Sequence, residues 1–160
     1  LIIAGPRDTE VRLKEMMESM LPGSHIMVPE FDLNWVDMEI MKPNPVGNHL
    51  VVTPYPAYHT AETNPTSVRC EAGGKTVSYT GDSAWTKHIP KISRDADLFI
   101  CESYFYEKPV RFHMNYPDVK AHWDEFQAKR TILTHFSREM LTMVDTVPEE
   151  CAHDGLVVEI

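Results

Sequence analysis

The sequence is poor in positive charge and contains no long apolar run. Its 160 residues include 15 Lys and Arg against 24 Asp and Glu, which gives a formal net charge of −9. Because nucleic-acid binding depends on Lys and Arg that neutralise phosphates, this balance argues against broad electrostatic capture of a polyanion. No stretch approaches the roughly twenty apolar residues that a membrane span needs. The sequence therefore predicts a protein that does not insert into a membrane.

Cysteine is scarce as well. The three cysteines, Cys70, Cys101 and Cys151, are too far apart for a zinc-knuckle pattern. Cys70 and Cys101 lie in apolar runs, where small buried thiols are common. We therefore expect a reducing environment and a cytoplasmic protein.

Alternating strand-like and helix-like segments predict one α/β domain, and 42% apolar residues suffice for its core. Strands, including a hairpin that turns at Gly73 and Gly74, are expected at 1–4, 35–41, 49–59, 67–80, 97–103, 131–137 and 155–160. Prolines in the segment 49–59 place that strand near a sheet edge. Helices are expected after Asp8 or Thr9, within 116–130 after Pro117, and after Ser137.

Two of these helices have an apolar face that should pack into the core. The face of the first consists of Val11, Met16, Met17, Met20 and Leu21. Its methionine-rich segment is more typical of a core face than of a cofactor or peptide groove. The face of the second consists of Val119, Trp123 and Phe126.

The segment TVSYTGDSAW (76–85) is strand-like as far as Gly81 and then presents a carboxylate, Asp82. Two interpretations compete. An Asp before Ser and Ala is a good helix N-cap, because its side chain accepts the free N–H groups of the first turn. Alternatively, an acidic side chain at the end of a buried strand lies where α/β proteins place their functional sites.

Three other polar side chains follow strand-like segments in the same way. His59 ends the strand 49–59, Glu102 comes at the end of the apolar run 97–101, and His135 comes at the end of the run TILT (131–134). A single histidine in such a place has a structural or surface role more often than a functional one. Together with Asp82, however, these residues could meet at one rim of a sheet, so we expect a shared site.

Several segments, in this order, resemble a known family: TGDSAW, DADLFICES, HMNYPDVKAH, TILTHFSREM and AHDGLVVEI. They are similar to the C-terminal half of metallo-β-lactamase-fold hydrolases, on the branch that includes ribonuclease Z and related phosphodiesterases. The resemblance covers nearly the whole chain. It implies a four-layer αββα fold, of which residues 1–160 would form the C-terminal part of one domain.

The resemblance also implies roles for individual residues. His59, Asp82 and His135 would be metal ligands, with Asp82 bridging two divalent ions. Zinc is the first choice for these ions, and manganese or iron would also suit the ligands. His113 would stand beside the metals and donate a hydrogen bond or proton to the phosphoryl group or leaving oxygen. Glu102 would either orient His113 or be a solvated carboxylate at a strand end.

One feature of the family is absent. Its His-x-His-x-Asp-His signature, which supplies most of the ligands, precedes the strand and GP turn with which this sequence begins. We therefore expect the chain to be the C-terminal portion of a longer protein and, alone, to bind metal poorly. The alternative is a split or degenerate half that works as a binding or assembly partner. The sequence leaves homodimer formation open.

The implied activity is hydrolysis of a phosphodiester or related small ester by a hydroxide held at a dinuclear metal site. Ribonuclease Z enzymes grip transfer RNA with a flexible basic arm, which bacterial forms insert between the third histidine and the GD aspartate. Here the interval from His59 to Asp82 is filled by a hairpin whose only basic residues are Arg69 and Lys75. Transfer RNA is therefore not the expected substrate.

The three tryptophans, Trp35, Trp85 and Trp123, are expected in the core. Trp85 follows Asp82 by three residues, which leaves open that it walls the pocket. His88, His122 and His153 are expected at the surface.

Overall fold

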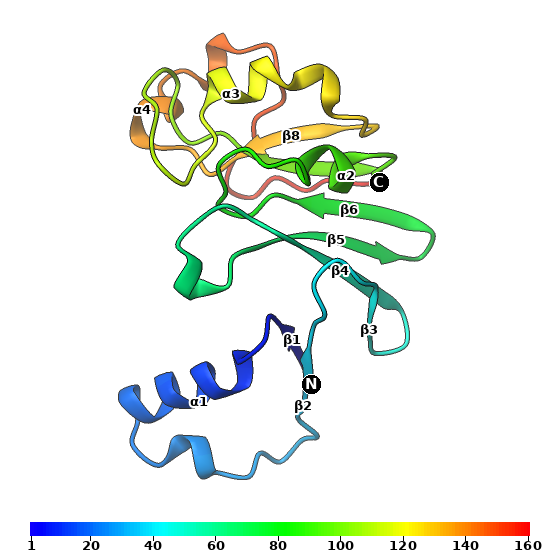
Figure 1. Cartoon of the computed structure of the whole chain (residues 1–160), viewed down its shortest axis with the longest axis vertical. Coiled ribbons are helices and arrows are strands. Elements are labelled where there is room, and N and C mark those ends of the chain that lie inside the picture. The colour runs from blue at the N-terminus through cyan, green and yellow to red at the C-terminus, as the bar shows by residue number, and fades with distance from the viewer.

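A six-stranded mixed sheet forms the centre of the structure, and a two-stranded sheet lies at its N-terminal end (Figure 1). The computed structural model describes all residues, 1–160. The large sheet has the order β3 (Asn44–Val46), β4 (Leu50–Pro56), β5 (Thr66–Ala72), β6 (Lys75–Tyr79), β7 (Leu98–Glu102) and β8 (Thr131–Thr134). The small sheet pairs β1 (Ile2–Gly5) with β2 (Asn34–Asp37) in parallel. The predicted α/β class is thus confirmed.

The direction of the strands decides where polar side chains can meet. Strands β3 to β6 are antiparallel, whereas β6, β7 and β8 are parallel to one another. Crossovers containing α2 (Ile89–Ser93) and α3 (Tyr116–Ala121) join the parallel strands. Because parallel strands end at the same edge of a sheet, the segments that follow β6, β7 and β8 lie together.

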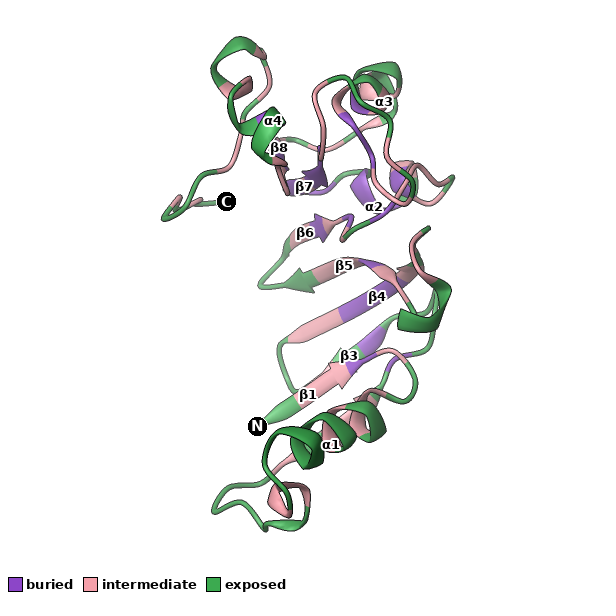
Figure 2. Cartoon of the chain, turned by 90° about the vertical axis from the view of Figure 1, so that its left-hand side faces the viewer, coloured by how far each residue is buried: buried purple, intermediate pink, exposed green.

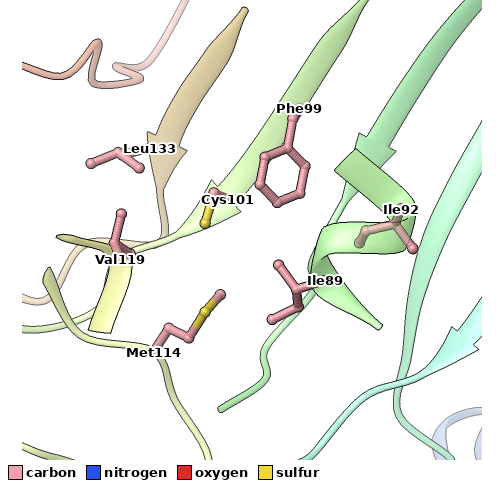
Figure 3. Packing of buried hydrophobic residues seen from close by; sticks show 7 residues of the cluster. All are labelled: Ile89, Ile92, Phe99, Cys101, Met114, Val119 and Leu133. Carbon is pink, nitrogen blue, oxygen red and sulfur yellow. The ribbon is translucent and has the colours of Figure 1, made fainter. Parts of the chain in front are cut away.

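The hydrophobic core lies between the parallel strands and their crossover segments (Figure 3). Phe99 and Cys101 of β7 and Leu133 of β8 supply the sheet side. The opposite side comes from α2, α3 and the loop before α3, through Ile89, Ile92, Met114 and Val119, and all seven side chains are completely buried. This packing fixes the strand ends that carry the polar side chains.

Helix α1 (Thr9–Met20) follows Asp8 as predicted, but its apolar face is not in the core. None of its residues is buried, and most of the helix is exposed (Figure 2). Met16, Met17 and Met20 are 51%, 40% and 78% exposed. The physical reason is that α1 packs chiefly against the short 3₁₀ turn η1 (Ser24–Ile26), which is too small to cover it. The expectation of a core face was therefore wrong for this chain.

Further differences concern element ends. The segment after Pro117 is helical only over α3, and after a 3₁₀ turn, η3 (Trp123–Glu125), the chain is tied to the turn before β7. The amide of Asp95 donates to the carbonyl of Gln127, and that of Lys129 donates to the carbonyl of Ala96. These long-range bonds hold the segment after η3 beside the turn before β7, and that segment is not helical.

The predicted strand 155–160 does not form. Cys151 pairs with Leu133 of β8 through an isolated bridge instead, and Val157 is 84% exposed. The predicted strand 35–41 is also shorter, because β2 ends at Asp37 and Met41 has a left-handed φ of 60°. Sequence analysis missed β3 and α2, whereas the hairpin turn at Gly73 and Gly74 is confirmed.

The remaining elements are short: α4 (Arg138–Leu141), η2 (Ala61–Thr63) and η4 (Val144–Thr146). The Ser137 side chain accepts a hydrogen bond from the amide of Met140, so Ser137 begins α4 as predicted. None of the helices has the length and apolar character that crossing a membrane requires.

Candidate metal centre

Asp82 lies just beyond the end of β6 and begins no helix. Gly81 turns the chain there with a φ of +61°, and a Cβ on it would lie 3.1 Å from the carbonyl oxygen of Thr66. The next helix, α2, begins only at Ile89. The N-cap interpretation of Asp82 is therefore wrong, and its carboxylate, 44% exposed, is available to a ligand.

His59 is brought to Asp82 by a short pairing of the segments that carry them. The amide of Ala84 donates to the carbonyl of Tyr58 at 3.0 Å. The amide of Tyr58 in turn donates to the hydroxyl of the buried Ser83 at 2.9 Å. As a result, His59, Asp82 and His113 each offer a ligand atom within 4.8 Å of the others.

Glu102 is the buried centre of the cluster. Its side chain is completely buried at the end of β7, so it is not a solvated strand-end carboxylate. Oε1 accepts hydrogen bonds from Nδ1 of His113 and from Nδ1 of His135, the latter at 2.7 Å. Oε2 accepts from the backbone amides of Ser83 and Met114, at 2.9 and 3.2 Å.

These hydrogen bonds determine which nitrogen of each histidine is free. When Nδ1 donates its proton to Glu102, Nε2 keeps the lone pair that can bind a metal or exchange a proton. Nε2 of His135 lies 3.6 Å from Oδ1 of Asp82. His135 has a left-handed φ of 60°, a conformation that is uncommon for a residue with a side chain and that concentrates at functional sites.

The structure gathers the five predicted site residues in one region, but the three predicted metal ligands, His59, Asp82 and His135, do not form one compact group. His59, Asp82 and His113 form one compact group, and Glu102, His113 and His135 form a second that shares His113. The position of His113 in both groups was not foreseen. Its distances to His59 and Asp82 would allow His113 to bind a metal directly as well as to lie beside one.

Two other residues shape the site and were missed from the sequence. The ring of Tyr104 stacks on His113 with 4.5 Å between centroids and lies 5.1 Å from the ring of His135. Ser83 fastens the segment that carries His59. The sequence offered one signal for them: Ser83 directly follows Asp82, and Tyr104 comes shortly after Glu102.

The surroundings of the site are electrically negative. Burial raises the pKa of the Tyr79 hydroxyl, and the charges of Asp82 and Glu102 raise it further. Burial also raises the pKa of Cys101, with a smaller effect from Glu102. Cys101 thus stays a protonated thiol and is no metal ligand, whereas the two carboxylates favour a cation at this place.

A histidine and carboxylate cluster at the edge of a mixed sheet is typical of metal-dependent enzymes. The family comparison agrees with the expected class. Residues 2–136 match the family described as the beta-lactamase superfamily domain, so the chain belongs to that superfamily. A search of curated proteins gave no match.

Among solved structures, the chain is similar to the metallo-beta-lactamase fold protein YhfI from Bacillus subtilis, with a TM-score of 0.73 and 23% identity over 99% of this chain. It is also similar to a diphosphatase from the PhnP family, with a TM-score of 0.74 and 19% identity over 99% of the chain. Human tRNase Z, short form (ELAC1), has a TM-score of 0.70 and 18% identity over 99% of the chain.

These likenesses concern the fold, and they confirm a metallo-β-lactamase fold. The chain spans only part of each neighbour: 65% of YhfI, 58% of the diphosphatase and 67% of human tRNase Z.

Proposed function

We propose that the protein is a metal-dependent hydrolase that cleaves a phosphodiester or a related small ester with two divalent metal ions. The observation that carries this proposal is the double hydrogen bond from His113 and His135 to the buried Glu102. A buried carboxylate that orients two imidazoles beside a second acidic residue, here Asp82, is typical of sites that bind metal and transfer protons. A diphosphatase and a transfer RNA processing enzyme among the structural neighbours fit the same class.

The donors present fit a divalent cation. His59, Asp82 and His135 would hold it, and Asp82 could bridge two ions because a carboxylate has two oxygens. Zinc is the preferred metal for imidazole and carboxylate ligands, with manganese and iron as alternatives. When bound, such ions lower the pKa of water and neutralise charge that develops on a phosphoryl group.

Three residues of this chain, Glu102, His113 and Tyr104, would orient the site and transfer the proton. Glu102 holds both imidazoles with Nδ1 protonated, so that Nε2 of each faces the site. His113, with Tyr104 stacked on its ring, is restricted in rotation. Once its Nε2 has also taken up a proton, the resulting imidazolium, held at Nδ1 by Glu102, is placed to donate that proton to the leaving oxygen. Because its ring cannot rotate freely, the proton donor His113 is already oriented before the substrate binds.

The ligand set of this chain is smaller than two four-coordinate ions require. We propose that an N-terminal portion of the same protein supplies the missing ligands. Native mass spectrometry of the protein from its source would detect such a portion as extra mass, and a His-x-His-x-Asp-His run in the reading frame before Leu1 would identify it. If neither the extra mass nor the signature were found, this would count against the enzyme and in favour of the alternative function.

That alternative is a half that works as a binding or assembly partner without chemistry. The exposed apolar residues of α1 favour contact with another polypeptide, because such side chains are ordinarily covered. Metal content separates the two functions. The enzyme should bind stoichiometric metal when complete, whereas an assembly partner need bind none.

Replacing His113 by alanine should lower turnover by about a hundredfold, because the proton donor to the leaving oxygen is lost. Metal content should stay at the wild-type level if His113 stands beside the metals. Both quantities can be measured on one preparation, by elemental analysis and by hydrolysis of bis(p-nitrophenyl) phosphate. Loss of metal together with activity would instead make His113 a ligand, as its distance to His59 and Asp82 allows.

Transfer RNA should not be trimmed. Both basic residues of the β5–β6 hairpin are engaged within the structure: Arg69 donates to the carbonyls of Ile92 and Arg94, and Lys75 lies 3.8 Å from Asp97. Metal-loaded complete protein should therefore hydrolyse bis(p-nitrophenyl) phosphate and leave precursor transfer RNA intact. Efficient, site-specific trimming of the RNA would contradict the small-substrate proposal.

A further inference from the structure

An open groove of about 520 Å³ lies directly beside His113. Its lining includes the aromatic side chains of Tyr58, Trp85 and Phe112 together with a single cation, Arg111. Substrate pockets commonly combine such apolar and aromatic walls with a few placed polar groups. Because His113 also lines the groove, whatever binds there reaches the candidate metal centre.

Trp85 is held rigidly at this groove. The imidazole of His122 covers one face of the indole, with 3.6 Å between ring centroids and an angle of 5° between the planes. His122 is itself fixed by a 2.6 Å contact of its Nδ1 with Glu125. The indole is thus set in place before any ligand arrives, which lowers the entropic cost of stacking a further ring against it.

Phe112 connects the groove to the metal centre. Its backbone has a left-handed φ of 74°, a strained conformation for an aromatic residue. Its ring lies 5.8 Å from that of Tyr58 and 5.4 Å from that of His59. A continuous set of aromatic surfaces therefore leads from the groove to a proposed metal ligand.

Arg111 gives the groove positive charge in an otherwise acidic chain. Its guanidinium lies 4.3 Å from the centre of the Phe112 ring, a cation–π contact that limits its motion. No carboxylate forms an ion pair with Arg111. The acidic residue that lines the groove, Asp118, accepts a hydrogen bond from the backbone amide of Asn115 at 3.0 Å.

We infer that this groove binds a planar aromatic group of the substrate, a nucleobase or a simple aryl ring, while Arg111 attracts the negative charge of the attached phosphate. Trp85 and Phe112 supply the stacking surface, and Arg111 supplies the charge. The inference rests on the proposed function, because it places the phosphoryl group next to His113. It assigns the substrate class as aromatic phosphoesters rather than alkyl ones.

Binding can be measured without turnover. In calorimetric titrations of the metal-loaded complete protein, phenylphosphonate and adenosine 5′-monophosphate should bind at least about ten times more tightly than methylphosphonate, since stacking on an aromatic side chain is worth that much. Trp85→Leu should reduce this ratio severalfold, because only Phe112 then remains for stacking, while the affinity for methylphosphonate should be kept. Arg111→Gln should weaken all three anions by a similar factor.

A matched control is Phe31→Leu, which removes an exposed aromatic ring from a segment outside the groove and should change nothing. Preference for adenosine 5′-monophosphate over phenylphosphonate would identify nucleotides, and the reverse would identify simple aryl esters. Equal wild-type affinities for phenylphosphonate and methylphosphonate, or a ratio unchanged in Trp85→Leu, would overturn the inference. A preserved aromatic preference without hydrolysis of any ester would overturn the proposed function alone.

Discussion

Replacing Asp82 by alanine should reduce hydrolysis below about a thousandth of the wild-type rate, because the only carboxylate placed between His59 and His135 would be gone. The fold should survive, since the Asp82 side chain is 44% exposed and makes no structural hydrogen bond to the backbone. The expected result is therefore a folded protein that has lost metal and activity together. Elemental analysis and the rate on bis(p-nitrophenyl) phosphate measure both.

Asp124→Ala is a suitable control, because Asp124 is an exposed aspartate in the turn η3 and should leave metal content and rate unchanged. Asp82→Asn tests whether the charge or the shape is needed. The amide is nearly the same size but has one oxygen acceptor instead of two, so it should also lose metal. Full metal content in Asp82→Ala would show that Asp82 is no ligand.

The second large effect is expected at Glu102. Glu102→Ala removes the acceptor for two imidazoles and two buried backbone amides. Each buried donor left without a partner costs about 1–3 kcal/mol, so the free energy of unfolding should fall by roughly 4 kcal/mol or more. Urea unfolding followed by circular dichroism measures this loss.

Glu102→Gln separates the effect on the site from the effect on stability. Glutamine keeps one acceptor, but its NH₂ group must face either the two imidazole N–H groups or the amides of Ser83 and Met114. We expect a smaller loss of stability and a drop in metal affinity of about 10- to 100-fold, as is usual when a residue that orients a ligand is changed. Glu139→Gln, an exposed glutamate on α4, should affect neither quantity. Wild-type metal affinity in Glu102→Gln would mean that Glu102 serves stability alone.

The general position of the site could be predicted because four of the five candidate residues come at or after the end of a strand, whereas His113 lies in the loop before α3. Asp82, Glu102 and His135 come after three strands that turn out to be parallel neighbours, and parallel strands end at one edge. His59 lies beyond the end of the antiparallel strand β4, and sequence periodicity does not indicate its distance from the other candidate residues. Its place depends on the pairing of Tyr58 with Ala84, a long-range contact without a local sequence signal.

Other features depended on packing that a local pattern does not contain. The methionine face of α1 has the spacing of a core face, but whether a partner covers it is decided by the rest of the fold. The segment 155–160 alternates like a strand, yet β8 is already bridged by Cys151. Similarly, His122, expected at the surface, and Trp85, expected in the core but half-buried, stack face to face, a contact between distant segments that no local pattern contains.

The hydrogen bonds of Glu102 also have a consequence for the order of folding. They join residues that lie 19, 11, 12 and 33 positions away along the chain, so no local segment can form the cluster by itself. Closing such loops costs chain entropy before the contacts compensate it, and β8 must add to β7 before His135 can arrive. We therefore expect the strands to form first and the imidazoles to reach their final orientation only in the last steps. Any metal would then bind to a nearly folded chain, and it would stabilise the native state rather than initiate folding.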